Sequence, residues 1–191
     1  MSRDTHRQPT PPRPGRGATA ARLAEILRVD HAGELAAVQI YRGQQAVMGA
    51  APGREALAER FGRMAAEEGE HLARFETLLN DRRVRPTLMA PVWRLAGFGL
   101  GAATALMGEK AAHACTEAVE TVIGEHYADQ VAELETRDPE LAAQLAAFRD
   151  DELAHRDAAV EDGAREAPGY SLLSAVIQAG CRAAIRISEK V

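Results

Sequence analysis

Two Glu-x-x-His motifs constrain the fold of this chain of 191 residues more than any other feature of its sequence. The first pairs Glu68 with His71, and the second pairs Glu152 with His155. Residues three apart lie on one face of an α-helix, so each motif directs a carboxylate and an imidazole the same way. The motifs therefore predict two helices that present ligand-type side chains to a common interior.

A further glutamate precedes each motif at a similar distance. Glu34 lies 34 residues before Glu68, and Glu120 lies 32 residues before Glu152. Helix pairs that each offer one Glu and one Glu-x-x-His form the ligand set of ferritin-like di-metal carboxylate proteins. This weak internal repeat predicts a four-helix bundle with metal in its core. Glu117 shares a helix face with Glu120, so spacing alone leaves the choice between them open.

The predicted ligands lie within apolar stripes. Their same-face neighbours are Phe61, Met64, Leu72 and Phe75 around Glu68, Leu27, Val38 and Tyr41 around Glu34, and Leu145, Phe148 and Ala159 around Glu152. Buried carboxylates are costly unless positive charge compensates them, and two divalent cations would supply it. Carboxylate and imidazole ligands suit iron or manganese, and the sequence shows no thiolate set for zinc or an iron-sulfur cluster.

Other polar residues near the motifs have plainer interpretations. Solvated charges, or partners that orient the ligands, are expected at Glu67, Glu70, Asp150, Asp151 and Asp157. His31 precedes Glu34 by one turn, where an orienting role and a plain polar helix face are equally compatible with the sequence.

Helical periodicity runs through most of the chain, and no strand pattern persists. The expected helices are residues 20–48, 54–80, 88–108 continuing through 109–136, 139–163 and 171–188. The fold class is all-α: a ferritin-like four-helix bundle with a di-iron core, plus extra amphipathic helices that face a membrane. Residues 1–18, rich in proline and arginine, are expected to be a disordered arm, and residues 19–191 a single domain.

Charge and cysteine content narrow the function classes. The formal net charge of -5 gives no reason to expect a nucleic-acid partner. Cys115 and Cys181 are far apart and form no Cys-x-x-Cys motif, so neither a disulfide scaffold nor a structural zinc site is indicated. A reducing compartment is expected.

From about residue 20 to the C-terminus, the chain resembles the demethoxyubiquinone hydroxylase family. The most specific stretch is RVDHAGE at residues 28–34, followed by IYRGQ at 40–44. Later stretches that agree are EGEH at 68–71, ACTEAVE at 114–120 and FRDDELAH at 148–155.

The resemblance implies a ligand arrangement for two irons per chain. It makes Glu34 and Glu120 terminal ligands, which sets Glu117 aside, and it makes Glu68 and Glu152 bridging ligands. The histidine of each motif would bind one iron.

The resemblance also implies a reaction. Family members are O2-dependent di-iron monooxygenases of ubiquinone biosynthesis that hydroxylate the ring of demethoxyubiquinol. Electrons are expected from NADH that is not tightly bound, since the chain has no Gly-rich nucleotide fingerprint. A His-Tyr pair of the family is implicated in electron delivery, and His126 and Tyr127 match it, although these residues also suit an ordinary amphipathic helix.

A polyprenyl substrate resides in a bilayer, so two apolar segments are candidates for membrane contact. Residues 95–108 are uncharged but too few to span a bilayer. The last helix places apolar or small residues opposite basic ones: Leu172, Leu173, Val176, Ile177, Gly180, Ala184 and Ile185 against Arg182, Arg186 and Lys190. With such a substrate, this pattern predicts a peripheral membrane protein. The N-terminal arm lacks the apolar region of a secretory signal, and its prolines would break a targeting helix, which favours the cytoplasmic side of a bacterial inner membrane. Packing in the core or against a lipid-binding accessory protein of quinone synthesis is the alternative.

Two other functions fit a ferritin-like di-metal site. One is iron storage with ferroxidase activity, and the other is hydroxylation of a different substrate. The apolar outer helices and the RVDHAGE stretch favour the quinol hydroxylase.

Overall fold

The computed structural model describes residues 19–191, which form six α-helices and one short 3-10 helix. In chain order these are α1 (Thr19–Gly49), α2 (Glu55–Asp81), α3 (Ala90–Leu106), α4 (Glu109–Leu134), α5 (Pro139–Glu161), η1 (Ala164–Glu166) and α6 (Tyr170–Ser188). The described residues contain no strand, and the all-α prediction is confirmed. The arm expected at residues 1–18 lies outside the described part of the chain.

Local sequence signals account for the helix boundaries, which fall within two residues of those expected. The side chain of Asp138 accepts a hydrogen bond from the backbone N–H of Leu141 at 3.2 Å, and Pro139 occupies the first helical position of α5. The long run after residue 88 is divided at Gly108, whose φ of +118° favours a residue without a Cβ atom.

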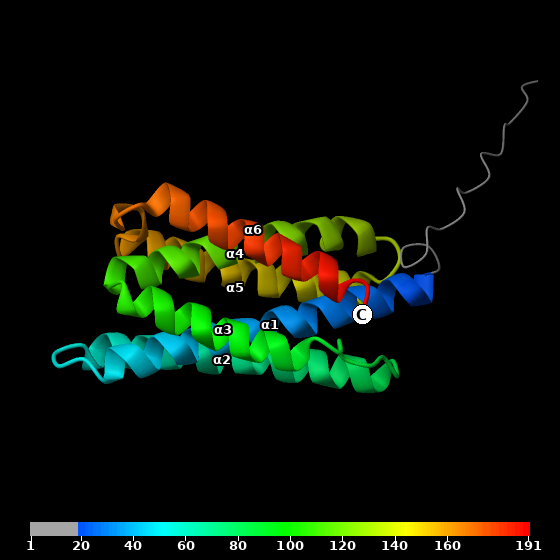
Figure 1. Ribbon diagram of the computed structural model, residues 1–191. Helices are drawn as coiled ribbons and strands as arrows, with labels where there is room; N and C mark the ends of the chain where they lie inside the picture. Colours follow the sequence, from blue (N-terminus) through cyan, green and yellow to red (C-terminus); the bar gives the residue numbers. More distant parts are fainter. Residues whose placement is uncertain (1–18) are drawn as a thin grey trace, which may run out of the picture.

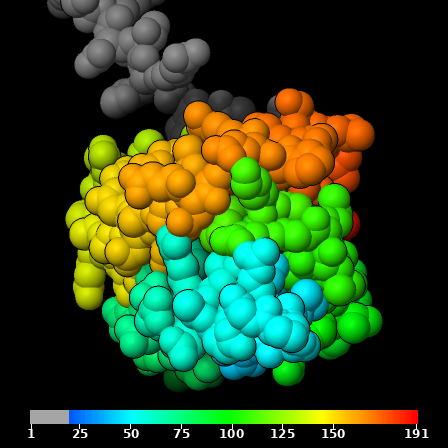
Figure 2. Space-filling view, turned by 90° about the vertical axis from the view of Figure 1, so that its left-hand side faces the viewer, coloured from blue at the N-terminus to red at the C-terminus, as the bar shows by residue number. Residues whose placement is uncertain are grey.

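Four long helices form the bundle that the sequence predicts. Helices α1 and α2 make one antiparallel pair and α4 and α5 make the other, as Figure 1 shows. Helix α3 packs on α1 and returns the chain to the start of α4, while α6 packs mainly on α4. Figure 2 looks onto the end where the α1–α2 loop (cyan), the α3–α4 turn (green) and residues 160–170 (orange) meet. The arrangement is ferritin-like, with α3 as the crossover and α6 added outside.

Two apolar clusters fill the bundle. One contains Phe75, Tyr127 and Leu145, and the other contains Tyr41 and Phe61. Along α1, α2 and α4, the predicted ligand glutamates lie between residues of the first cluster and residues of the second. The two clusters therefore enclose a polar layer in the middle of the bundle.

Close backbone contact fixes α3 against α1. A Cβ atom added to Gly97 would lie 2.6 Å from the carbonyl oxygen of Ala36, and one added to Gly101 would lie closer still to that of Ile40. Only glycine permits this approach at both positions, because any side chain would meet rigid backbone.

The exposed apolar residues of α3 and α6 correct one expectation. Leu172 and Val176 of α6 are 73% and 61% exposed, and Leu95 of α3 is 76% exposed. Ile177, by contrast, is 5% exposed and packs in a cluster that Leu173 also contacts. Assigning all seven α6 residues to one lipid-facing surface was wrong, because the helix turns Leu173 and Ile177 toward α4. Within residues 19–191, no helix is long and apolar enough to cross a membrane.

Candidate metal centre

Each of the four bundle helices contributes one buried glutamate to the polar layer. Glu34 comes from α1, Glu68 from α2, Glu120 from α4 and Glu152 from α5, and none is more than 1% exposed. The helical spacing within each motif adds a histidine on the same face of α2 and of α5. Six side chains that lie far apart in the sequence thus meet in the centre of the bundle.

The six side chains form two overlapping groups of four. Glu34, Glu68, His71 and Glu152 can place one donor atom each within 4.8 Å of one another, and so can Glu68, Glu120, Glu152 and His155. Glu68 and Glu152 belong to both groups. The arrangement has the composition of two adjacent metal positions that share two carboxylates.

The histidines present one ring nitrogen to this cluster and the other to an outer carboxylate. Nδ1 of His71 lies 3.3 Å from Glu152, while its Nε2 lies 3.3 Å from Asp151. Nδ1 of His155 lies 3.0 Å from Glu68, while its Nε2 lies 3.0 Å from Glu67. Outer carboxylates of this kind fix the orientation of metal-binding imidazoles. Of the two roles considered for Asp151 and Glu67, the geometry favours orienting the histidines.

Two tyrosine hydroxyls hold the glutamates of the opposite helix. Tyr41 of α1 donates a hydrogen bond to Oε1 of Glu120 at 2.6 Å, and Tyr127 of α4 donates one to Oε1 of Glu34. Each tyrosine follows its own helix's glutamate by seven residues, or two helical turns. Sequence reasoning missed the contact of Tyr41, although the shared Glu-x6-Tyr spacing was a signal for it.

Burial and mutual repulsion make the glutamate cluster electrostatically unfavourable by itself. Burial raises the pKa of Glu34 and of Glu120 well above the ordinary value, and the nearby charges of Glu152 and Glu68 raise both further. Compensating positive charge is therefore required at this position.

The histidine pKa values respond to the same negative charge. Burial alone would lower the pKa of His71, but interactions with Glu152 and Glu68 raise it to about 10. The same two glutamates, acting against burial, raise the pKa of His155 to about 11. At neutral pH both rings therefore hold protons that bound cations would displace.

The donor atoms are available for cations. Both carboxylate oxygens of Glu68 and of Glu152 are buried without a well-formed hydrogen bond, as is Nδ1 of His71. Because unsatisfied buried polar atoms are rare in folded proteins, so many in one place indicate a missing partner. Carboxylate oxygens with imidazole nitrogens form a donor set that iron accepts, so the residues present fit a di-iron site.

Two alternatives from the sequence lie apart from the donor groups. Glu117 is buried, but its Oε1 accepts a hydrogen bond from the hydroxyl of Tyr170 at 3.0 Å. His31 lines a separate recess together with Glu76 and Arg94. Neither belongs to the two donor groups found among residues 19–191, and the geometry favours Glu120 over Glu117.

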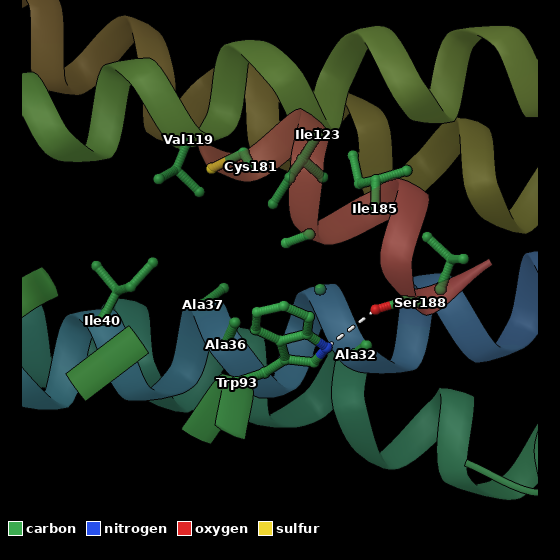
Figure 3. Close-up of a pocket in the computed structure, with 13 residues that line it drawn as sticks. Ala32, Ala36, Ala37, Ile40, Trp93, Val119, Ile123, Cys181, Ile185 and Ser188 are labelled. Atoms are coloured by element: carbon green, nitrogen blue, oxygen red, sulfur yellow. Dashed lines mark hydrogen bonds between the residues drawn. The ribbon is translucent and has the colours of Figure 1, made fainter. Parts of the chain in front are cut away.

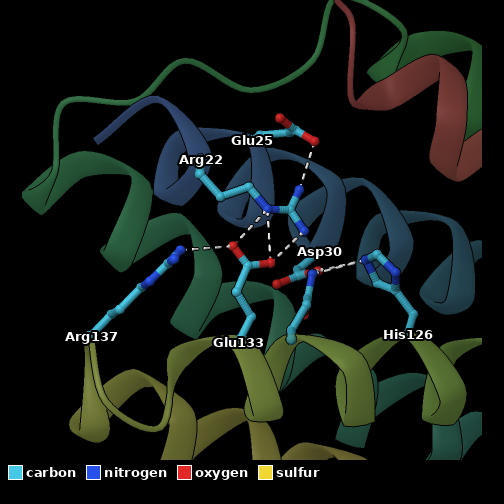
Figure 4. A network of polar contacts seen from close by, with 7 residues as sticks. Arg22, Glu25, Asp30, His126, Glu133 and Arg137 are labelled. Carbon is cyan, nitrogen blue, oxygen red and sulfur yellow. Dashed lines mark hydrogen bonds and ion pairs between the residues drawn. The ribbon is translucent and has the colours of Figure 1, made fainter. Parts of the chain in front are cut away.

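His126 lies at the end of a polar network between α1 and α4, shown in Figure 4. Its Nε2 is 2.8 Å from Nε2 of Gln130 and 3.5 Å from Oδ1 of Asp30, and Gln130 donates a hydrogen bond to the same Asp30 oxygen at 2.8 Å. The side chain of His126 is 20% exposed. His126 and Tyr127 are thus neighbours that point to different places, one toward Gln130 and Asp30 and the other toward Glu34.

An apolar cavity of about 90 Å³ lies between α1, α4 and α6 (Figure 3). Its wall includes Ala37, one turn after Glu34, and Ile123, one turn after Glu120. Trp93 of α3 also lines it. The cavity therefore adjoins the helix segments that carry the buried glutamates.

Comparison with known proteins identifies related chains. Residues 21–188 match the family described as "Ubiquinone biosynthesis protein COQ7". A 3-demethoxyubiquinol 3-hydroxylase of Rhodospirillum rubrum is 49% identical over 178 residues, covering 93% of this chain and 82% of that protein. A mitochondrial NADPH-dependent 3-demethoxyubiquinone 3-hydroxylase of Homo sapiens is 45% identical, covering 90% and 79%. A mitochondrial 5-demethoxyubiquinone hydroxylase of Saccharomyces cerevisiae is 39% identical, covering 91% and 80%.

Proposed function

This chain belongs to the ubiquinone biosynthesis protein COQ7 family, and we propose that it hydroxylates the ring of a polyprenyl demethoxyubiquinol with O2 at a di-iron site. The observation that carries the proposal is the pair of four-residue donor groups that share Glu68 and Glu152. Two relatives with hydroxylase names cover about nine tenths of the chain, which favours this activity over iron storage.

In this proposal, Glu34 and His71 bind one iron, and Glu120 and His155 bind the other. Glu68 and Glu152 would serve as ligands of both ions, because they are the members common to both donor groups. Tyr41 and Tyr127 hold the outer oxygens of the terminal glutamates and so fix which oxygen faces the metal.

The irons, when bound, supply the coordination positions and electrons for O2 activation. One oxygen atom enters the ring as a hydroxyl group, and the other leaves as water with two electrons and two protons from a reductant. The protein's own contribution is to position the ring and exclude water. The apolar cavity beside Ala37 and Ile123 suits both tasks, so we assign it to the quinol ring.

Electrons reach the site from a reduced nicotinamide nucleotide, which we propose to be NADH. The printed name of the human relative specifies NADPH, so the two donors must be compared directly. His126 and Tyr127 are the proposed relay. The partly exposed His126 gives access from the surface, and the Tyr127 hydroxyl contacts a proposed ligand.

Quinone profiling of a deletion strain tests this function. A strain without the gene should accumulate the demethoxy intermediate, and the wild-type gene should restore the hydroxylated product. Glu68→Ala should fail to restore it, because the change removes a donor from both groups, and the purified variant should lose most of both irons. Normal quinone content in the strain that expresses Glu68→Ala would contradict the assigned site.

Exposed apolar residues of α3 and α6 support peripheral binding to a membrane, which we propose on the cytoplasmic side of a bacterial inner membrane. Leu95, Leu172 and Val176 are each more than half exposed, and the exposed Arg186 adds positive charge on α6. Apolar side chains beside basic ones are typical of helices that lie on anionic lipid.

Two aspartates on α6 should separate membrane access from metal binding. We expect Leu172→Asp/Val176→Asp to lower binding to anionic vesicles at least about tenfold, since burial of each side chain is worth about 1.5–3 kcal/mol. Iron content should not change, because both residues are exposed. Ala73→Asp/Thr77→Asp places the same charges at the same spacing on exposed positions of α2 and serves as the control. If both double variants bound vesicles equally well, the membrane contact would have to lie outside α6.

A further inference from the structure

The apolar cavity is too small for the ring that we assign to it. Its volume is about 90 Å³, whereas a cavity of roughly 150 Å³ is known to hold one benzene molecule. A quinol ring with methyl, methoxy, hydroxyl and prenyl substituents is larger than benzene. The cavity must therefore enlarge before it can hold the ring.

One polar contact crosses the cavity between α3 and α6. The indole Nε1 of Trp93 donates a hydrogen bond to Oγ of Ser188 at 2.9 Å, and Figure 3 shows this bond joining the two helices at one end of the cavity. Both residues line the cavity. Trp93 is partly exposed while Ser188 is 2% exposed, so the hydrogen bond joins a side chain that solvent reaches to a buried one.

Neighbouring residues place this contact at the apolar surface. Val92 and Leu95, beside Trp93 on α3, are exposed, and so is Ile187, beside Ser188 on α6. A prenyl tail that rests on these residues would bring its ring to the Trp93–Ser188 contact. The contact therefore lies where a lipid-borne ring would enter.

Movement of the α3 backbone is the less favourable route to an opening. Gly97 and Gly101 pack directly against backbone carbonyl groups of α1, and this close packing would be lost if α3 moved away. The indole side chain of Trp93 and the C-terminal end of α6 remain as the movable parts, and the Trp93–Ser188 hydrogen bond joins them.

We propose that Trp93 is the gate of the quinol cavity and that its hydrogen bond to Ser188 holds the gate closed. This inference rests on the proposed function, which places the ring in the cavity. Opening breaks the hydrogen bond and turns the indole away, so the ring enters from the lipid-facing side. Trp93 then controls admission of the substrate without taking part in the oxygen chemistry.

Trp93 is the only tryptophan of the chain, so its fluorescence reports directly on the cavity. Quenching by a short-tailed ubiquinone, followed by stopped flow, measures entry of the ring in the full-length, iron-loaded protein. Ser188→Ala should raise the association rate constant about two- to tenfold, the factor expected for loss of one ordinary hydrogen bond. The apparent Kd should fall by the same factor, since the open fraction limits both.

Ser174→Ala is the matched control, because Ser174 is a buried serine of the same helix away from the cavity. It should leave both constants unchanged. Trp93→Phe removes the N–H donor of the same hydrogen bond, and this variant replaces Ser188→Ala in the test if Ser188→Ala fails to fold. Its kcat/KM for a short-tailed quinol should rise while its iron content stays constant.

The outcomes separate the gate from the proposed function. The gate would be overturned if the association rate constant from saturable quenching were the same in the wild type and in Ser188→Ala and if kcat/KM were unchanged in Trp93→Phe. Trp93 would then be a static part of the cavity wall. Weaker binding in Ser188→Ala would show that the hydrogen bond persists in the bound state, which also overturns it. Absence of saturable quenching together with absence of turnover would reject the quinol substrate itself.

Discussion

Glu120→Gln is expected to lose at least about 100-fold in hydroxylase activity and most of the iron at one position. The amide keeps the size of the side chain and can still accept the hydrogen bond from Tyr41, but it removes the negative charge that a terminal ligand supplies. Burial and nearby charge already raise the pKa of Glu120 well above its usual range. A neutral group there should therefore leave the metal-free fold at least as stable as the wild type. Iron analysis, turnover and thermal melting of the metal-free protein measure the three effects.

Glu117→Gln is the matched control, one helical turn earlier on the same helix. Glu117 is buried to a similar degree, but it accepts its hydrogen bond from Tyr170 and belongs to neither donor group. Its iron content and activity should remain within about twofold of the wild type. If Glu117→Gln lost the metal and Glu120→Gln kept it, the ligand would lie one turn earlier and the assignment of the second donor group would be wrong.

The fold and the members of the cluster could be predicted because their signals are local. The Glu-x-x-His spacing places two side chains on one face by helix geometry alone, and apolar neighbours such as Phe61 and Phe75 mark that face as buried. Pro139 marked the start of a helix by its backbone preference, whereas the division at Gly108 came from the structure. Glu34 and Glu120 needed more than local spacing: they came from the repeat of helix pairs, and the family resemblance decided between Glu120 and Glu117.

The missed features depend on how helices rotate and pack against one another. Trp93 and Ser188 are 95 residues apart, and their hydrogen bond follows from the positions of α3 and α6 on α1 and α4. Helical periodicity showed that α6 is amphipathic, but it could not say which apolar residues turn inward. Ile177 was therefore predicted on the lipid-facing surface, which was wrong. Burial of its side chain depends on where α4 lies, and helical periodicity does not give that position.

The packing of α3 on α1 leads to the largest stability change that we expect from a single methyl group. Gly101→Ala would place a Cβ atom in severe overlap with the carbonyl oxygen of Ile40, and a backbone atom inside a helix cannot move aside. Helix α3 would have to separate from α1. We expect a loss of about 3 kcal/mol in the free energy of unfolding, at the upper end of the cost of overpacking and larger than the gain of about 1 kcal/mol in helix propensity.

Gly99→Ala makes the same change two residues earlier, where an added Cβ atom meets nothing within 4 Å. It should stabilise the protein by about 0.5–1 kcal/mol, because alanine restricts the unfolded chain more than glycine does. The two variants should therefore shift the melting temperature in opposite directions, with Gly101→Ala lower by roughly 6–12 °C at about 2–4 °C per kcal/mol. Melting of the metal-free proteins checks this. Equal melting temperatures would show that α3 can slide on α1, and the fixed backbone that the Trp93 gate requires would be lost.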